Sequence, residues 1–237
     1  MRLGELKAQL ANVADPARAI ACKRYFKTGK GEYGEGDVFI GITMPQVRQV
    51  VRQFRDLPLS DISELLHSPV HEKRMCALLI LVSSFERGDE SLRRKIYRFY
   101  LANTKYINNW DLVDLSAPRI VGAYLLANHG SGDVLMRLAK SRDLWKRRIA
   151  IMSTFAFIQA GRHIPTFNIA ALLLNDEHDL IHKAVGWMLR EVGKRIDRET
   201  EEEFLKKHYK QMPRTMLRHA IERFPRRLQL AYLGGRI

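Results

Sequence analysis

The sequence has few of the features that mark secreted, membrane-spanning or disulfide-stabilised proteins. Its 237 residues include only two cysteines, Cys22 and Cys76, and these form no CxxC pair, so neither a disulfide framework nor a thiolate zinc site is expected. The longest uninterrupted apolar run covers residues 75–82, whereas a bilayer-spanning helix needs roughly 20 apolar residues. The first residues contain no apolar signal region. We therefore expect a cytoplasmic protein without a membrane span.

Patterns typical of metal hydrolases and cysteine nucleophiles are also missing. His178 and His182 are spaced as neighbours on one helix face, but there is no HExxH motif and no evident third ligand. We expect these histidines to be surface or capping residues, and we expect no metal site. Both cysteines lie in apolar helical contexts without a paired histidine, which argues against a cysteine nucleophile.

Positive charge is what the sequence has in abundance. The sequence contains 40 basic and 26 acidic residues, which gives a formal net charge of +14. The excess is uneven, since residues 137–237 carry 21 basic and 11 acidic residues, whereas residues 1–136 carry 19 and 15. A strong positive field favours a polyanionic partner, because neutralising phosphates releases condensed counterions. The composition therefore points to nucleic acid.

Helical periodicity dominates the chain, and strand-like alternation is short wherever it occurs. Short turn signals separate the periodic segments, so neighbouring helices should pack antiparallel. The sequence predicts one all-α domain over residues 1–237, with about a dozen helices. The clearest amphipathic segments are His71–Glu86, Glu90–Leu101, Trp110–Ala127, Asp143–Gln159, Leu180–Lys194 and Thr200–His208. The turn signals are Gly88-Asp89, His129–Gly132, Ala160–Arg162, Asn175-Asp176 and Met212-Pro213.

One early segment, Gly29–Gly36, contains a formal GxGxxG pattern. In a dinucleotide site these glycines follow a strand and open a helix that holds the pyrophosphate. Here a helical pattern at Ala17–Lys27 precedes them, and Val38–Thr43 does not continue as a crossover helix. We therefore interpret residues 29–37 as a flexible glycine-rich loop.

A degenerate repeat of 34 to 40 residues runs through the chain. Its period is typical of stacked helix pairs, so we predict a HEAT-like superhelix, or solenoid. Small residues follow the aligned position in several repeats and would let adjacent helices approach closely. The aligned positions are Arg74, Asp114, Arg148, Lys183 and Arg218, and the small residues are Cys76, Ser116, Ala150 and Gly186.

Equivalent positions of a solenoid line up on one face. Arg74, Arg148, Lys183 and Arg218 would then form a basic ladder on a concave DNA-binding face, matching a phosphate backbone whose charges also repeat. A solvated helix surface is the alternative explanation of these basic residues.

Asp114 has the opposite charge from the rest of the ladder. Trp110 precedes it by four residues and lies on the same helix face, and Trp187 follows Lys183 by four residues. We therefore predict a functional site made of Asp114, Trp110, Trp187 and Arg148. Each residue also has a structural alternative, such as core packing for a tryptophan or helix capping for an aspartate.

At these residues the sequence resembles the AlkD-like DNA glycosylases of the HEAT-repeat DNA alkylation repair family. The most specific matches are the Trp-Asp-x-x-Asp and Lys-Ala-x-Gly-Trp-x-Leu-Arg-Glu stretches, and the resemblance covers about residues 20–220. The matching stretches are Lys23–Lys27, Gly41–Arg48, Asn109–Asp114, Leu144–Ile151, Lys183–Glu191 and Arg214–His219. One departure is Asn109, which stands where some relatives have a second tryptophan.

The resemblance implies a monofunctional enzyme that excises positively charged alkylated purines, chiefly N3-methyladenine and N7-methylguanine, from duplex DNA. It assigns the catalytic carboxylate to Asp114, the aromatic packing residues to Trp110 and Trp187, and a catalytic-site arginine to Arg148. It also implies that the base stays in the duplex while the enzyme grips the backbone. The predicted DNA contacts are Tyr25, Arg48, Arg74, Arg147, Lys183, Arg190, Arg214 and Arg218. We expect no metal or organic cofactor, and a monomer.

Other functions use some of the same features. A non-catalytic HEAT-like protein that binds damaged, bent or branched DNA would use the same basic ladder, but a carboxylate facing phosphates would weaken its binding. A protein-interaction scaffold would present mixed charge and apolar anchors rather than a strongly basic C-terminal part.

Overall fold

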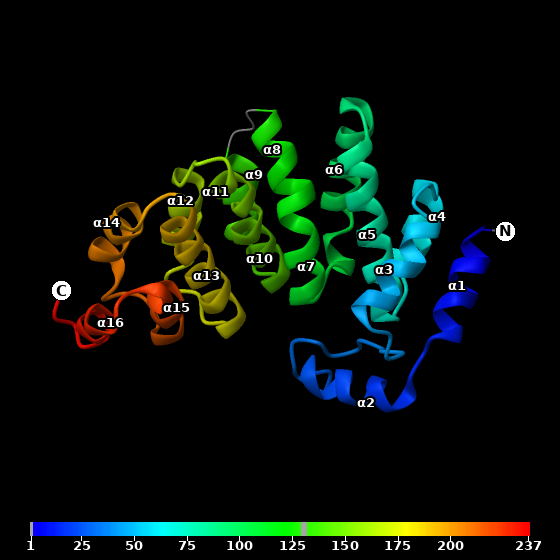
Figure 1. Cartoon of the computed structure of the whole chain (residues 1–237), viewed down its shortest axis with the longest axis horizontal. Coiled ribbons are helices and arrows are strands. Elements are labelled where there is room, and N and C mark those ends of the chain that lie inside the picture. The colour runs from blue at the N-terminus through cyan, green and yellow to red at the C-terminus, as the bar shows by residue number, and fades with distance from the viewer. Residues whose placement is uncertain (1, 129–131) are drawn as a thin grey trace. The chain divides into compact units, whose positions relative to one another are not determined.

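The computed structural model describes residues 2–128 and 132–237, which form helices joined by short connections (Figure 1). Within these ranges the β pairing consists of an isolated bridge between Val38 and Val70, which confirms the all-α prediction. The packing divides the chain into two compact units, Met1–Ser116 and Ala117–Ile237. No helix in the described ranges has both the length and the apolar character needed to cross a bilayer. Of the predicted turn at His129–Gly132, residues 129–131 lie outside the described residues.

The first unit is organised around one long buried helix, α5 (His71–Arg87). Twelve of its 17 residues are buried, which explains the eight-residue apolar run found in the sequence. It packs against α3, α4 and α6, and Figure 1 shows α2 below the lower ends of α3 and α5. The other helices of this unit are α1 (Arg2–Asn12), α2 (Pro16–Tyr25), α3 (Met44–Gln53), α4 (Leu59–Leu66), α6 (Glu90–Ala102), the 3-10 helix Thr104–Tyr106 and α7 (Trp110–Ala117), which ends at the unit boundary.

Local sequence signals set where these helices begin. Thr43 and Gln46 form a capping box at the start of α3, in which each side chain bonds the other residue's backbone N–H. Asp89 accepts a hydrogen bond from the Leu92 N–H and caps α6, so the Gly88-Asp89 turn signal is confirmed.

The glycine-rich segment is a series of turns, not the start of a nucleotide-binding helix. The Glu32 and Glu35 carboxylates accept hydrogen bonds from the N–H groups of Gly29 and Gly31, both at 2.8 Å. No helix opens directly after these glycines, because the next one is α3 at Met44. The loop interpretation is therefore confirmed, and its flexibility stays a prediction.

The helical run predicted at Trp110–Ala127 is interrupted. A π-helical segment, Pro118–Gly122, separates α7 from α8 (Ala123–Ala127). Pro118 has no N–H to donate and its ring crowds the preceding turn, which accounts for the altered register there. The predicted run Asp143–Gln159 likewise divides at Thr154 into α10 (Leu144–Ser153) and α11 (Phe155–Gln159).

The second unit is built from closely packed helices. A Cβ added at Gly186 would lie 2.4 Å from the carbonyl oxygen of Met216, so α13 and α15 approach more closely than any side chain at this position would allow. The small-residue prediction is thus confirmed at Gly186. The remaining helices of this unit are α9 (Asp133–Ala139), α12 (Ile164–Leu172), α13 (Asp179–Arg195), α14 (Arg198–His208), α15 (Arg214–Ala220), the 3-10 helix Ile221–Arg223 and α16 (Arg226–Leu233).

Candidate functional site

Trp110, the first residue of α7, belongs to an aromatic cluster in the first unit. Its ring stacks on Phe26, with the centroids 5.4 Å apart, and meets the edge of Tyr25 at 5.9 Å. Phe26 in turn stacks on Phe39 at 4.9 Å. We define the aromatic cluster as Tyr25, Phe26, Phe39, His71 and Trp110. Because Trp110 is only half-buried and Tyr25 is 66% exposed, the cluster reaches the surface at these two rings.

Asp114 lies one helical turn after Trp110 on α7 and is half-buried. This is the same-face arrangement that the four-residue spacing predicts. Asp114 also affects a buried group. Burial, together with the charge of Asp114, raises the pKa of the Tyr100 hydroxyl, and a hydrogen bond with Ser116 acts in the opposite direction.

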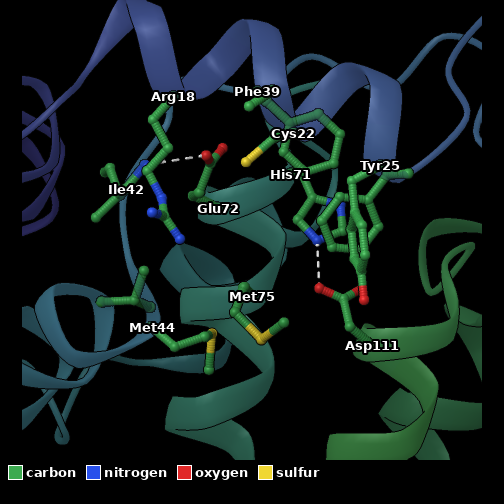
Figure 2. Close-up of a pocket in the computed structure, with 13 residues that line it drawn as sticks. Arg18, Cys22, Tyr25, Phe39, Ile42, Met44, His71, Glu72, Met75 and Asp111 are labelled. Carbon is green, nitrogen blue, oxygen red and sulfur yellow. Dashed lines mark hydrogen bonds and ion pairs between the residues drawn. The ribbon is translucent and has the colours of Figure 1, made fainter.

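A network of buried charged groups lies beside the aromatic cluster. Asp37 Oδ1 is 2.6 Å from Arg74 Nη2, and Asp37 Oδ2 is 3.1 Å from His71 Nδ1. His71 Nε2 is 2.8 Å from Asp111 Oδ2 (Figure 2). The Asn109 side-chain amide donates to Asp37 at 3.1 Å. We call Asp37, His71, Arg74, Asn109 and Asp111 the buried network.

The pKa values in the buried network follow from these contacts. Burial alone would raise the pKa of Asp37, but the hydrogen bond with His71 and the charge of Arg74 hold it below its ordinary value. Burial alone would lower the pKa of His71, but hydrogen bonds to Asp111 and Asp37 raise it. The geometry thus favours a carboxylate at Asp37 and an imidazolium at His71.

The position of Arg74 in the structure contradicts the predicted basic ladder. Arg74 is 4% exposed and is paired with Asp37, and it also donates to the backbone oxygens of Ser68 and Pro69. Arg74 therefore does not lie on an exposed basic face, and its DNA contact stays a prediction. Helical phase placed it on a common face, but the chain segment around Asp37 covers that face.

A cavity of about 400 Å³ lies between α2, α3 and α5 in the first unit. Residues 40–42, beside this cavity, are held by Glu72. Its carboxylate accepts hydrogen bonds from the N–H groups of Ile40, Gly41 and Ile42 at 2.8–3.3 Å. Gly41 has φ +82°, and a Cβ there would lie 2.0 Å from the Asp15 carbonyl oxygen, so only glycine fits. Figure 2 shows His71 and Asp111 at one end of this cavity, with Arg18 and Met44 toward the other.

In the second unit, Arg148 and Trp187 each donate a hydrogen bond to another residue of that unit. Arg148 on α10 is 5% exposed, and its Nη1 donates to the Leu180 carbonyl oxygen at 2.5 Å. Trp187 on α13 is half-buried, and its Nε1 donates to Glu191 at 3.3 Å. Burial alone would raise the pKa of Glu191, but the hydrogen bond from Arg195 lowers it, which favours the carboxylate that Trp187 bonds.

The other predicted DNA contacts differ in exposure. Five of them are exposed and two are ion-paired and half-buried. The exposed ones are Tyr25, Arg48, Lys183, Arg214 and Arg218. Arg147 pairs with Asp176 at 2.5 Å, and Arg190 pairs with Glu222. Their DNA contacts, and the predicted basic concave face, stay predictions.

The histidine pair considered as a metal site has a structural role. His178 is the N-cap of α13 and accepts a hydrogen bond from the Leu180 N–H, and His182 contacts the Asp176 carbonyl oxygen. This confirms the capping interpretation for His178. In the described part of the chain, no three His, Cys, Asp or Glu side chains gather as metal ligands do.

Comparison with known proteins identifies the family. A family model for DNA alkylation repair enzymes matches residues 6–224, which is most of the chain. The chain belongs to this DNA alkylation repair enzyme family. Membership confirms the resemblance found in the sequence, and the family's name implies enzymatic DNA repair with DNA as the substrate.

A solved structure supports the fold of this DNA alkylation repair family member. The chain matches a predicted DNA alkylation repair enzyme from Enterococcus faecalis with a TM-score of 0.69 and 16% identity, over 90% of this chain and 97% of the other. At that identity the match establishes a shared fold. Comparison with curated proteins finds no match.

Sequence reasoning missed most of the buried network. It used the second aspartate of the Trp-Asp-x-x-Asp motif, and it gave no role to Asp111, Asp37 or His71. One signal was His71, a titratable residue at the start of the helix that carries the longest apolar run of the sequence. The aromatic partner Phe26, next to Tyr25, was missed as well.

Proposed function

We propose that this protein is a monofunctional DNA glycosylase. It hydrolyses the N-glycosidic bond of positively charged alkylated purines, chiefly N3-methyladenine and N7-methylguanine, in duplex DNA. The observation that carries the proposal is the placement of Trp110 and Asp114 one turn apart on α7, both half-buried, in a chain of the DNA alkylation repair family.

The chemistry requires few catalytic groups. A normal purine leaves as an anion unless an acid protonates it, whereas a purine alkylated at N3 or N7 already carries positive charge and leaves neutral. One carboxylate therefore suffices, in contrast to the pair that ordinary glycosidases use. Asp114 stabilises the positive charge that develops on the deoxyribose and orients the attacking water. This chemistry needs no metal or organic cofactor.

Trp110 offers an electron-rich face to the cationic sugar, worth roughly 0.5–2 kcal/mol as a cation–π interaction. Its contacts with Phe26 and Tyr25 support this role, because they hold the indole before substrate arrives. The resemblance assigns a similar role to Trp187. It also assigns Arg148 to the catalytic site, where its guanidinium holds a DNA phosphate if it exchanges its present contact with the Leu180 carbonyl oxygen for that phosphate.

Binding of the duplex is assigned to the exposed basic and aromatic residues. A net charge of +14 supports an electrostatic grip on the phosphate backbone that weakens with salt. Arg147 and Arg190 contribute if they exchange their present carboxylate partners for phosphates. The proposed contacts are Tyr25, Arg48, Arg147, Lys183, Arg190, Arg214 and Arg218.

The test is release of free base from a duplex that carries one N7-methylguanine, under single-turnover conditions and in the presence of EDTA. The proposal predicts free N7-methylguanine and an abasic site, with the matched undamaged duplex left intact. Tight binding of both duplexes without base release would favour the non-catalytic DNA-binding function instead.

A further inference from the structure

The buried network holds His71 between two carboxylates. Its Nδ1 is 3.1 Å from Asp37 and its Nε2 is 2.8 Å from Asp111. A neutral imidazole can donate from only one nitrogen and would leave the other facing a carboxylate without a proton. The doubly protonated ring donates at both. With Arg74 also present, two cations and two carboxylates then balance within the network.

His71 links two segments that are distant in the sequence. Asp37 ends the glycine-rich loop, and Asp111 lies in the first turn of α7. A second connection runs in parallel, because Asn109 donates to Asp37 while its side-chain oxygen accepts the Trp110 N–H at 2.8 Å. The first turn of α7, which carries Trp110, is therefore linked to Asp37 twice, once through Asp111 and His71 and once through Asn109.

The ring of His71 is also part of the aromatic cluster. It stacks on Phe39 with centroids 4.4 Å apart and lies 5.2 Å from Phe26, which stacks on Trp110. A cationic ring against aromatic faces gains a cation–π attraction. The orientation of Trp110 thus depends on His71 through Phe26 and through Asp111.

We propose that His71 is a positioning residue whose imidazolium, held between Asp37 and Asp111, fixes Trp110 and the first turn of α7 for base excision. The effect on excision rests on the proposed function, whereas the effect on Trp110 does not. His71 itself touches no substrate and acts through Trp110.

The surroundings of His71 account for a charged ring. Acidic groups reach it from two other segments, and the remaining neighbouring ionisable groups lie on α2 and α5. These groups are Asp37 from the loop, Asp111 from α7, Glu72 and Arg74 from α5, and Arg18 and Cys22 from α2 across the cavity. Glu72 is occupied by the backbone N–H groups of residues 40–42, so Asp37 and Asp111 are the partners of the ring.

The first measurement is the protonation state of His71, read from the ring nitrogens of ¹⁵N-histidine-labelled protein and assigned with His71→Gln. We expect both nitrogens protonated at pH 7.5, where a free histidine is mostly neutral. Asp111→Asn keeps an acceptor but removes a charge, so it should move the His71 titration to lower pH. A neutral ring in the wild type, or no shift in Asp111→Asn, would overturn the proposal.

The second measurement follows Trp110 by fluorine NMR of 5-fluorotryptophan-labelled protein, with Trp110→Phe to assign its signal. His71→Gln should shift the Trp110 signal and leave those of Trp145 and Trp187 in place. The matched control is His67→Gln, which removes an exposed histidine that bonds Asn103 in the same unit. If His71→Gln does not fold, Asp111→Asn provides the test instead. Titration of His71 should change the Trp110 signal, and Asp111→Asn should move that change to lower pH. An unchanged Trp110 signal would overturn the proposal.

The third measurement is single-turnover excision. His71→Gln should slow it about 10- to 100-fold, the scale expected for a misplaced catalytic group, with duplex binding nearly unchanged. Excision by His67→Gln should equal the wild type. If His71→Gln excises at the wild-type rate, the positioning role is wrong. If the wild type itself releases no base, the proposed function fails, and the Trp110 signal alone decides whether His71 positions that residue.

Discussion

Replacing Gly186 by alanine tests the close packing of α13 against α15. The added Cβ would lie 2.4 Å from the Met216 carbonyl oxygen and 2.6 Å from the His219 Cβ. Neither atom belongs to the far end of a flexible side chain, so α15 itself must move to make room. Gly186 directly precedes Trp187, and α15 carries Arg214 and Arg218, so the packing also sets the positions of predicted site residues.

Two opposing effects determine the size of the change. Alanine is favoured over glycine in a helix interior by about 1 kcal/mol. Overpacking a well-packed contact costs about 1–3 kcal/mol, and the rigid neighbours here favour the upper part of that range. We therefore expect Gly186→Ala to lower the free energy of unfolding by about 1–2 kcal/mol.

The assay is urea unfolding followed by circular dichroism, with the transition midpoint compared at constant m-value. The matched control is Gly4→Ala on α1, where a Cβ would meet nothing within 4 Å. That variant should gain up to about 1 kcal/mol from helix propensity alone. If Gly186→Ala proves as stable as the wild type, or more stable, the argument from close helix packing is wrong.

Two further predictions concern charge in the second unit. Burial, followed by the neighbouring charge of Glu202, raises the pKa of Glu201 to about 9. The unfolded chain therefore releases this proton near pH 4.5 while the folded chain keeps it, and stability falls as the pH rises between these values. In urea unfolding, the free energy of unfolding of Glu201→Gln should exceed that of the wild type, and the difference should increase from pH 5 to pH 8. A difference that decreases over this range would contradict the prediction. Arg218→Ala should weaken binding to all duplexes alike and reduce the slope of log affinity against log salt by about 1, and a loss confined to damaged duplexes would refute a phosphate contact.

Much of the helical framework could be predicted from periodicity. The segment expected at His71–Glu86 is α5, His71–Arg87, and the one expected at Leu180–Lys194 lies within α13. The breaks at Pro118 and Thr154 were not predicted, because the apolar pattern continues through both. A π-helical turn adds a residue without removing the amphipathic face, so it leaves little trace in the pattern.

The candidate site was predictable only in part. The same-face placement of Trp110 and Asp114 follows from a four-residue spacing, which local geometry decides. The burial of Arg74 does not follow from local geometry, because its partner Asp37 is 37 residues earlier in a loop whose position depends on tertiary packing. Helical phase assigns a residue to a face, and only the packed chain shows whether that face is covered.

The central claim is that Asp114 is the catalytic carboxylate of a DNA glycosylase. It is tested most directly by comparing Asp114→Asn with the wild type on a duplex carrying one N7-methylguanine, measuring binding and single-turnover base release separately. We predict nearly unchanged binding and a fall in excision of roughly 10²-fold or more, the scale of losing one key electrostatic stabiliser. Weakened binding with normal excision at saturation would contradict this role for Asp114.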